Sequence, residues 1–116
     1  MSRVKVGKYF LNSDGVNPVV QVIAPATNTQ GAILRTIFMF AGPSTGLAAA
    51  FLYADTSAPS VAGDASKRLI AQVNALGNTT NGIIVPYEIE VPAGLGVWIG
   101  QQLGGRVELT WDLISV

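Results

Sequence analysis

The C-terminal segment RVELTWDLISV alternates between apolar and polar side chains along most of its length. Its apolar positions are Val107, Leu109, Trp111 and Leu113, and its polar positions are Arg106, Glu108, Thr110 and Asp112. A period of two places successive side chains on opposite faces of a β-strand. The segment therefore predicts a half-buried strand, with one face on a core and the other in solvent.

A second segment, IIVPYEIEV, repeats this alternation with Glu88 and Glu90 on its polar face. The residues predicted to point inward are Ile83, Val85, Tyr87, Ile89 and Val91. Pro86 falls on the outer face in this phase. Because proline cannot donate a ladder hydrogen bond, it favours an edge strand or a bulge at this position.

Two further segments, AILRTIFMFAG and LAAAFLYAD, are apolar on both faces. In the first segment one face is predicted to carry Ile33, Ile37 and Met39, and the other Leu34, Phe38 and Phe40. Strands without a polar face lie between two layers of structure or beneath a neighbouring subunit. Both segments are therefore expected to be covered on each side.

Clusters of Gly, Pro, Asn, Asp and Ser interrupt the chain at short intervals and predict turns. They leave strands near residues 3–11, 17–24, 31–41, 46–54, 67–75, 82–91, 95–101 and 105–115. This spacing predicts one domain over residues 1–116, an all-β antiparallel β-sandwich of about eight strands, jelly-roll-like in design. The segment SKRLIAQVNAL also fits a short helix, so residues 67–76 stay open between strand and helix.

The glycine-rich stretch VPAGLGVWIGQQLGG raises the question of a phosphate-binding loop. Gly94, Gly96 and Gly100 are spaced G-x-G-x-x-x-G, one residue longer than the dinucleotide fingerprint, and no helix-forming run follows. We interpret residues 92–94 as a tight turn, residues 97–99 as a short strand, and Gly104-Gly105 as the hairpin turn before the last strand.

The sequence offers few groups for catalysis or metal binding. It contains no histidine and no cysteine, which removes the commonest general base and the commonest nucleophile pairs. Asp55 and Asp64 flank the loop DTSAPSVAGD and could share a calcium ion, but two acids in a loop are weak evidence. We therefore expect neither an enzyme nor a bound metal or cofactor.

Charge and hydropathy argue against nucleic-acid and membrane partners. Seven basic residues balance seven acidic ones and are scattered, so no basic patch is expected. The N-terminal sequence lacks the apolar run of a signal peptide, and no segment approaches the roughly 20 apolar residues of a membrane span. We expect synthesis in the cytoplasm.

Charged residues make up 12% of the chain, against about 25% in typical soluble domains. Because monomers rarely expose large apolar patches, we expect the chain to associate with copies of itself. The predicted contact residues are Phe38, Phe40, Phe51 and Tyr53. The alternative is that these four side chains fill the monomer core. The N-terminal arm 1–8 stays open between an ordered segment and one that reaches onto a neighbour.

The chain resembles the small β-sandwich or jelly-roll virion proteins of tailed bacteriophages in three features. These are the V-P-A-G turn before GLGVWIG, the run of about eight short strands, and the final strand RVELTWDLISV. The likeness extends to trimeric jelly rolls of the tumour-necrosis-factor type. The phage resemblance implies a trimer or higher ring, made in the host cytoplasm and located in the virion. Such a ring decorates a capsid or builds part of a tail or fibre, contacts other virion structural proteins, and has no catalytic role.

The alternative function is a glycan-binding module in which an aromatic side chain stacks on a sugar ring. Trp111 and Tyr87 lie in the apolar phase of their strands, where an aromatic side chain is normally part of the core. Trp98 stands between Val97 and Ile99, and the pattern does not place it. It is therefore the candidate stacking residue. A small enzyme is a third and less favoured alternative.

Overall fold

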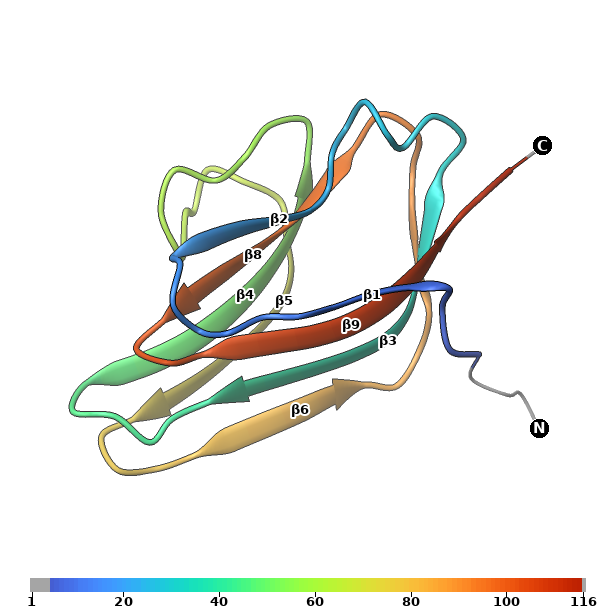
Figure 1. The fold of residues 1–116 in the computed structure, drawn as a ribbon. Helices are drawn as coiled ribbons and strands as arrows, with labels where there is room; N and C mark the ends of the chain where they lie inside the picture. The colour runs from blue at the N-terminus through green and yellow to red at the C-terminus, as the bar shows by residue number, and fades with distance from the viewer. Residues whose placement is uncertain (1–4, 116) are drawn as a thin grey trace.

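The structure, a computed structural model, describes residues 5–115 and folds that range into nine strands in two antiparallel sheets (Figure 1). Sheet A contains, in spatial order, β1 (Tyr9–Asn12), β9 (Arg106–Leu113), β3 (Ala32–Ala41) and β6 (Asn81–Val85), while β7 (Ile89–Val91) also pairs with β3. Sheet B contains β2 (Val19–Ile23), β8 (Gly96–Gln102), β4 (Leu47–Asp55) and β5 (Leu69–Leu76). This range contains no helix that could cross a membrane.

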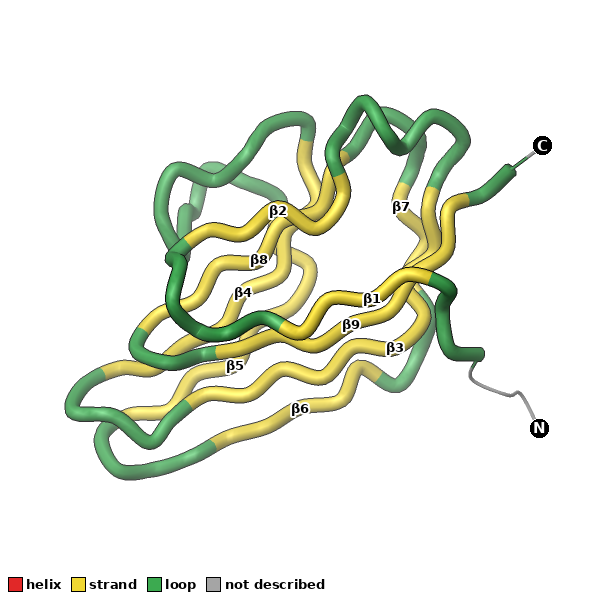
Figure 2. The backbone as a smooth tube through the Cα atoms, viewed as in Figure 1, coloured by secondary structure: helices red, strands yellow, loops and turns green. Residues whose placement is uncertain are grey.

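The strand order is that of a jelly roll. Figure 2 shows β6 and β7 as two pieces separated by a loop segment, and both pair with β3. If β6 and β7 are counted as one interrupted strand, the described residues form eight strands. In this count the first, eighth, third and sixth strands form sheet A, which are β1, β9, β3 and β6 with β7. The second, seventh, fourth and fifth form sheet B, which are β2, β8, β4 and β5. The predicted all-β sandwich is therefore confirmed. Residues 67–76, left open between strand and helix, contain strand β5.

The main core lies between the two sheets. Leu34 and Met39 from sheet A and Leu52 and Ile99 from sheet B are fully buried there. The alternation predicted for the last strand is confirmed, because Val107, Leu109 and Trp111 are buried and Leu113 packs against the same core. The prediction of two covered faces is confirmed for LAAAFLYAD, since seven consecutive residues of β4 are buried. It was wrong for AILRTIFMFAG, because Phe38 on the outer face of β3 is exposed.

The predicted faces of β3 were wrong for Ile33 and Leu34. Leu34 opposes Trp111 of β9, but the next pair in the register is Thr36 with Thr110, so Arg35 is an extra residue at a β-bulge. The bulge reverses the phase of the strand. Leu34 therefore shares the core face with Ile37 and Met39, and Ile33 does not.

The predicted inward position of Tyr87 was also wrong. Pro86 ends β6, and residues 86–88 connect it to β7 outside any strand. The Tyr87 side chain is 65% exposed. Because the alternation holds only while the backbone stays in the ladder, Ile83 and Val85 before the break and Ile89 and Val91 after it still pack inward.

The predicted hairpin before the last strand was wrong, because β8 and β9 lie in different sheets and do not pair. The chain crosses between the sheets in a tight turn, which falls one residue earlier than predicted. Leu103 and Gly104 have φ angles of 50° and 84°, and the N–H of Gly105 donates to the carbonyl of Gln102 at 3.1 Å. Two central residues with positive φ define a type I′ turn, in which asparagine followed by glycine is strongly preferred. Leu103 is therefore a poor residue at this position.

We expect Leu103→Asn to raise the free energy of unfolding by about 1 kcal/mol, because a left-handed conformation costs leucine roughly 1–2 kcal/mol and asparagine less. Urea unfolding followed by circular dichroism would measure the change. Leu103→Val is the matched control and should lower stability, since a branched Cβ fits positive φ worse. Equal stability of the three proteins would contradict this reading of the turn.

The first strand is shorter than predicted. The sequence predicts a strand near residues 3–11, whereas β1 covers Tyr9–Asn12, so it begins later and ends one residue beyond the predicted range. Residues 1–4 and 116 lie outside the described residues, so the question raised about the arm 1–8 applies here only to residues 5–8. The backbone N–H groups of Gly7 and Lys8 donate to side chains on β9, which ties this part of the arm to sheet A.

Candidate interaction surface

The outer faces of the two sheets differ in what covers them. On sheet B, Ala49, Phe51, Tyr53 and Trp98 form a second apolar cluster outside the main core. The loop 56–68, which follows β4, packs on this cluster through Ala62 and is seen beside sheet B in yellow-green in Figure 1. Burial under this loop raises the pKa of the Tyr53 hydroxyl. The chain thus covers the aromatic cluster of sheet B with its own residues, while Leu47, Leu69 and Leu76 on the same face stay exposed.

The covering loop lies very close to the sheet. A Cβ atom on Gly100 of β8 would stand 3.2 Å from the Cα of Ala62, and one on Gly63 would stand 3.2 Å from the ring of Phe51. A side chain at Gly100 would push Ala62 outward by a few tenths of an ångström. The glycine at 100, which formed part of the possible phosphate loop, therefore allows the 56–68 loop to pack directly on the backbone of β8.

Asp55 and Asp64 hold this loop in place. Asp64 accepts hydrogen bonds from the hydroxyl groups and backbone N–H groups of Ser66 and Ser60, at 2.6 to 3.1 Å, and these bonds hold its pKa well below the ordinary range. Asp55 accepts from the N–H groups of Arg68 and Thr56, which also lowers its pKa. The described residues contain no group of three or more acidic side chains placed to hold a metal ion.

The four predicted contact residues do not form one cluster. Phe51 and Tyr53 are buried beneath the loop on sheet B. Phe38 and Phe40 lie on the opposite side of the sandwich, because their neighbours Ile37 and Met39 point into the main core. Of the four, Phe38 and Phe40 therefore stand on a face that the 56–68 loop does not cover.

Trp98, the predicted sugar-stacking residue, is 3% exposed. Its ring lies across Gly96, where a Cβ atom would stand 2.7 Å from the ring atom Cη2 and 2.7 Å from Cδ of Pro25. The tryptophan is thus packed between its own strand and the segment after β2. No ring face is open to a sugar in this arrangement.

The outer face of sheet A is open and partly apolar. Phe38 of β3 stands opposite Ile84 of β6, and both lie on this face. Their side chains are 37% and 72% exposed, and the neighbouring Tyr87 is 65% exposed. Arg106 of β9 lies over the ring of Phe40, with its guanidinium carbon 5.4 Å from the ring centre. A cation at this distance stabilises an aromatic ring at the edge of a patch.

A groove of about 400 Å³ runs along this face. One side is formed by Ile84, Pro86 and Tyr87, and the opposite side by Asn12 and Glu108. Residues 35–38 of β3 lie between the two sides, as the strand order requires. We name this surface the sheet A groove. Its walls are mainly apolar, and its volume lies within the range of ligand-binding clefts.

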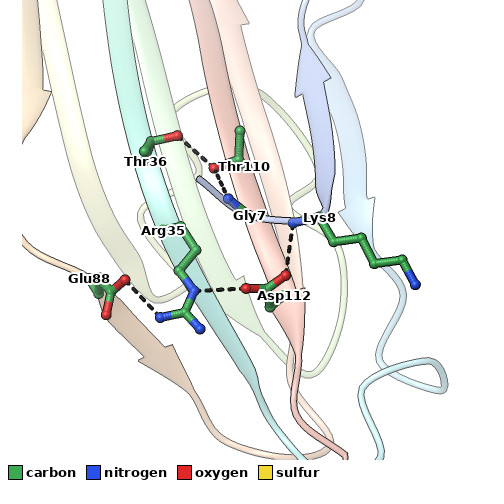
Figure 3. Close-up of polar contacts among 7 residues, drawn as sticks. All are labelled: Gly7, Lys8, Arg35, Thr36, Glu88, Thr110 and Asp112. Carbon is green, nitrogen blue, oxygen red and sulfur yellow. Dashed lines mark hydrogen bonds and ion pairs between the residues drawn. The ribbon is translucent and has the colours of Figure 1, made fainter. Parts of the chain in front are cut away.

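An ion-pair network closes one end of the sheet A groove (Figure 3). The Arg35 guanidinium donates to Glu88 at 2.8 Å and to Asp112 at 2.9 Å. These two bonds raise the pKa of Arg35. Asp112 also accepts from the backbone N–H of Lys8 at 2.8 Å, and this bond, with that from Arg35, lowers its pKa. The network holds the segment that carries Tyr87, because Glu88 is the next residue.

A second contact in Figure 3 joins three parts of the chain at the same end. The hydroxyl groups of Thr36 and Thr110 are 2.6 Å apart, and the Thr110 oxygen accepts from the N–H of Gly7 at 2.9 Å. The bulge at Arg35 puts Arg35 and Thr36 side by side at this point. Contacts within the chain therefore hold this end of the groove.

Ile84 and Tyr87 were not among the predicted contact residues. A signal for Ile84 is present in the sequence, since it is an apolar residue at an outward position of IIVPYEIEV, whose later outward positions carry glutamate. Tyr87 had no such signal, because only the break at Pro86 exposes it. Comparisons of the chain with protein-family models, curated proteins and solved structures found no match.

Proposed function

We propose that the chain is a non-enzymatic structural protein that assembles with copies of itself and binds neighbouring subunits of a virion, as a capsid decoration or as part of a tail. The observation that carries this proposal is the contrast between the two sheets. The aromatic cluster of sheet B is covered by the chain's own loop, whereas sheet A exposes Phe38, Ile84 and Tyr87 around a groove. Contiguous exposed apolar residues of this kind mark interaction sites.

Two further observations support a structural role. The strand order is that of a jelly roll, the architecture of the virion proteins that the sequence resembles. Four of the seven acidic side chains are engaged in contacts within the chain. Asp55 and Asp64 bind loop backbone, and Glu88 and Asp112 pair with Arg35. A fold alone does not give a function, so the proposal rests mainly on the open face.

The first test is the mass of the protein in solution, measured by size-exclusion chromatography with light scattering over a wide range of dilution. We expect an oligomer whose mass persists on dilution, since the open apolar face favours association. A particle of 12.1 kDa at every concentration would contradict self-assembly. A persistent oligomer would then be tested for binding to assembled capsids and tails.

A further inference from the structure

We infer that the outer face of sheet A pairs with the same face of a second copy, and that Phe10 of each copy enters the sheet A groove of the other. The inference rests on the proposed self-assembly and specifies its contact. Phe10 opposes Thr110 in the ladder between β1 and β9, so its side chain lies on the same face as the groove. It is 70% exposed.

The position of Phe10 favours a second copy as the occupant. The face carries a projecting aromatic side chain on β1 and a groove between β9, β3 and β6. Two copies related by a two-fold axis can therefore fill both grooves at once, which is the condition for a self-complementary interface. A phenyl ring needs a space of about 150 Å³. The groove, at about 400 Å³, holds the ring and part of a neighbouring side chain.

The exposed area is sufficient for such a pair. An aromatic side chain offers about 200 Å² and isoleucine somewhat less. Multiplying these areas by the exposed fractions gives about 450 Å² of exposed apolar surface for four side chains, those of Phe10, Phe38, Tyr87 and Ile84. An interface of standard size takes about 800 Å² from each partner, of which about 450 Å² is apolar. The face therefore supplies the apolar part of one stable interface.

Variants on the two parts of the contact test this pairing. The wild-type protein should have twice the mass of one chain, and Phe10→Ser and Ile84→Arg should each raise the dissociation constant of the dimer by about 30-fold or more. Leu76→Arg is the matched control, because Leu76 is 70% exposed on β5 of the other sheet. It should leave the dimer unchanged. Circular dichroism would confirm that all three variants fold.

Because the chain has no cysteine, cross-linking gives a direct second test. A mixture of the Phe10→Cys and Ile84→Cys proteins should form a mixed disulfide dimer under mild oxidation, and Leu76→Cys mixed with either should not. A dimer that survives both surface variants, or that gives no mixed disulfide, would overturn the inferred contact and leave self-assembly standing. A trimer, as the phage resemblance implies, would do the same. A monomer would contradict both proposals.

Discussion

Gly105→Ala should lower the free energy of unfolding by about 4 kcal/mol. Gly105 follows the turn between β8 and β9, where the chain passes from sheet B to sheet A. A Cβ atom at this position would overlap the carbonyl oxygen of Ala49 and stand 2.5 Å from its carbonyl carbon. These atoms belong to the backbone of β4, a strand paired on both sides, so they cannot move away without breaking a ladder.

Urea unfolding of the two proteins, followed by circular dichroism, would measure this effect. Gly94→Ala is the matched control, because its Cβ atom would have no neighbour within 4 Å and the residue has a φ of 87°. That variant should lose only the cost of a left-handed alanine, about 1 kcal/mol. If the two variants were equally stable, close packing against β4 would not be the reason for glycine at 105.

Most of the fold could be predicted from the alternation of apolar and polar side chains within single strands. In β9 every second residue points to the core, as its sequence predicts, because the strand pairs regularly with β1 on one side and continues along most of β3 on the other. Side-chain period is a local property of a regular ladder. It therefore fails where the ladder is irregular, at the bulge beside Arg35 and at the break after Pro86. Neither irregularity changed the number of layers or the order of the elements in the chain.

The open face could be predicted only in part. The sequence indicated that β3 and β4 have two apolar faces, and it could not indicate which outer face the chain covers itself. The covering loop is rich in small and polar residues, and only its fold brings Ala62 and Gly63 onto Phe51 and Gly100. Phe51 and Phe38 thus have similar sequence surroundings and different positions, one buried and one exposed.

The network at the end of the groove had no sequence signal. In the sequence, Arg35 is 53 residues from Glu88 and 77 residues from Asp112. They meet because β9 and β7 both pair with β3 near the bulge. Long-range contacts of this kind follow from topology, and a single sequence does not fix the register that creates them.

Among variants of the aromatic cluster on sheet B, Trp98→Ala has the largest expected effect on stability. It should lower the free energy of unfolding by about 3 to 5 kcal/mol. The tryptophan is 3% exposed and packs with Ala49, Phe51 and Tyr53. Its removal would leave a cavity on the outer face of β8, against Gly96 and Pro25. Because the surrounding strands are paired on both sides, the site can collapse only slightly.

The same variant separates a packing role from a binding role. A stacking residue on an exposed platform changes stability by less than about 0.5 kcal/mol when it is truncated, whereas a packed one changes it several-fold more. Trp98→Phe is the control, since a smaller ring keeps most of the apolar contacts and should cost much less than alanine. Urea unfolding of the three proteins would decide between the two roles. Unchanged stability of Trp98→Ala would contradict the packing role and return Trp98 to the glycan hypothesis. A large loss would confirm that Trp98 is a packing residue, which the chain buries on sheet B together with Ala49, Phe51 and Tyr53.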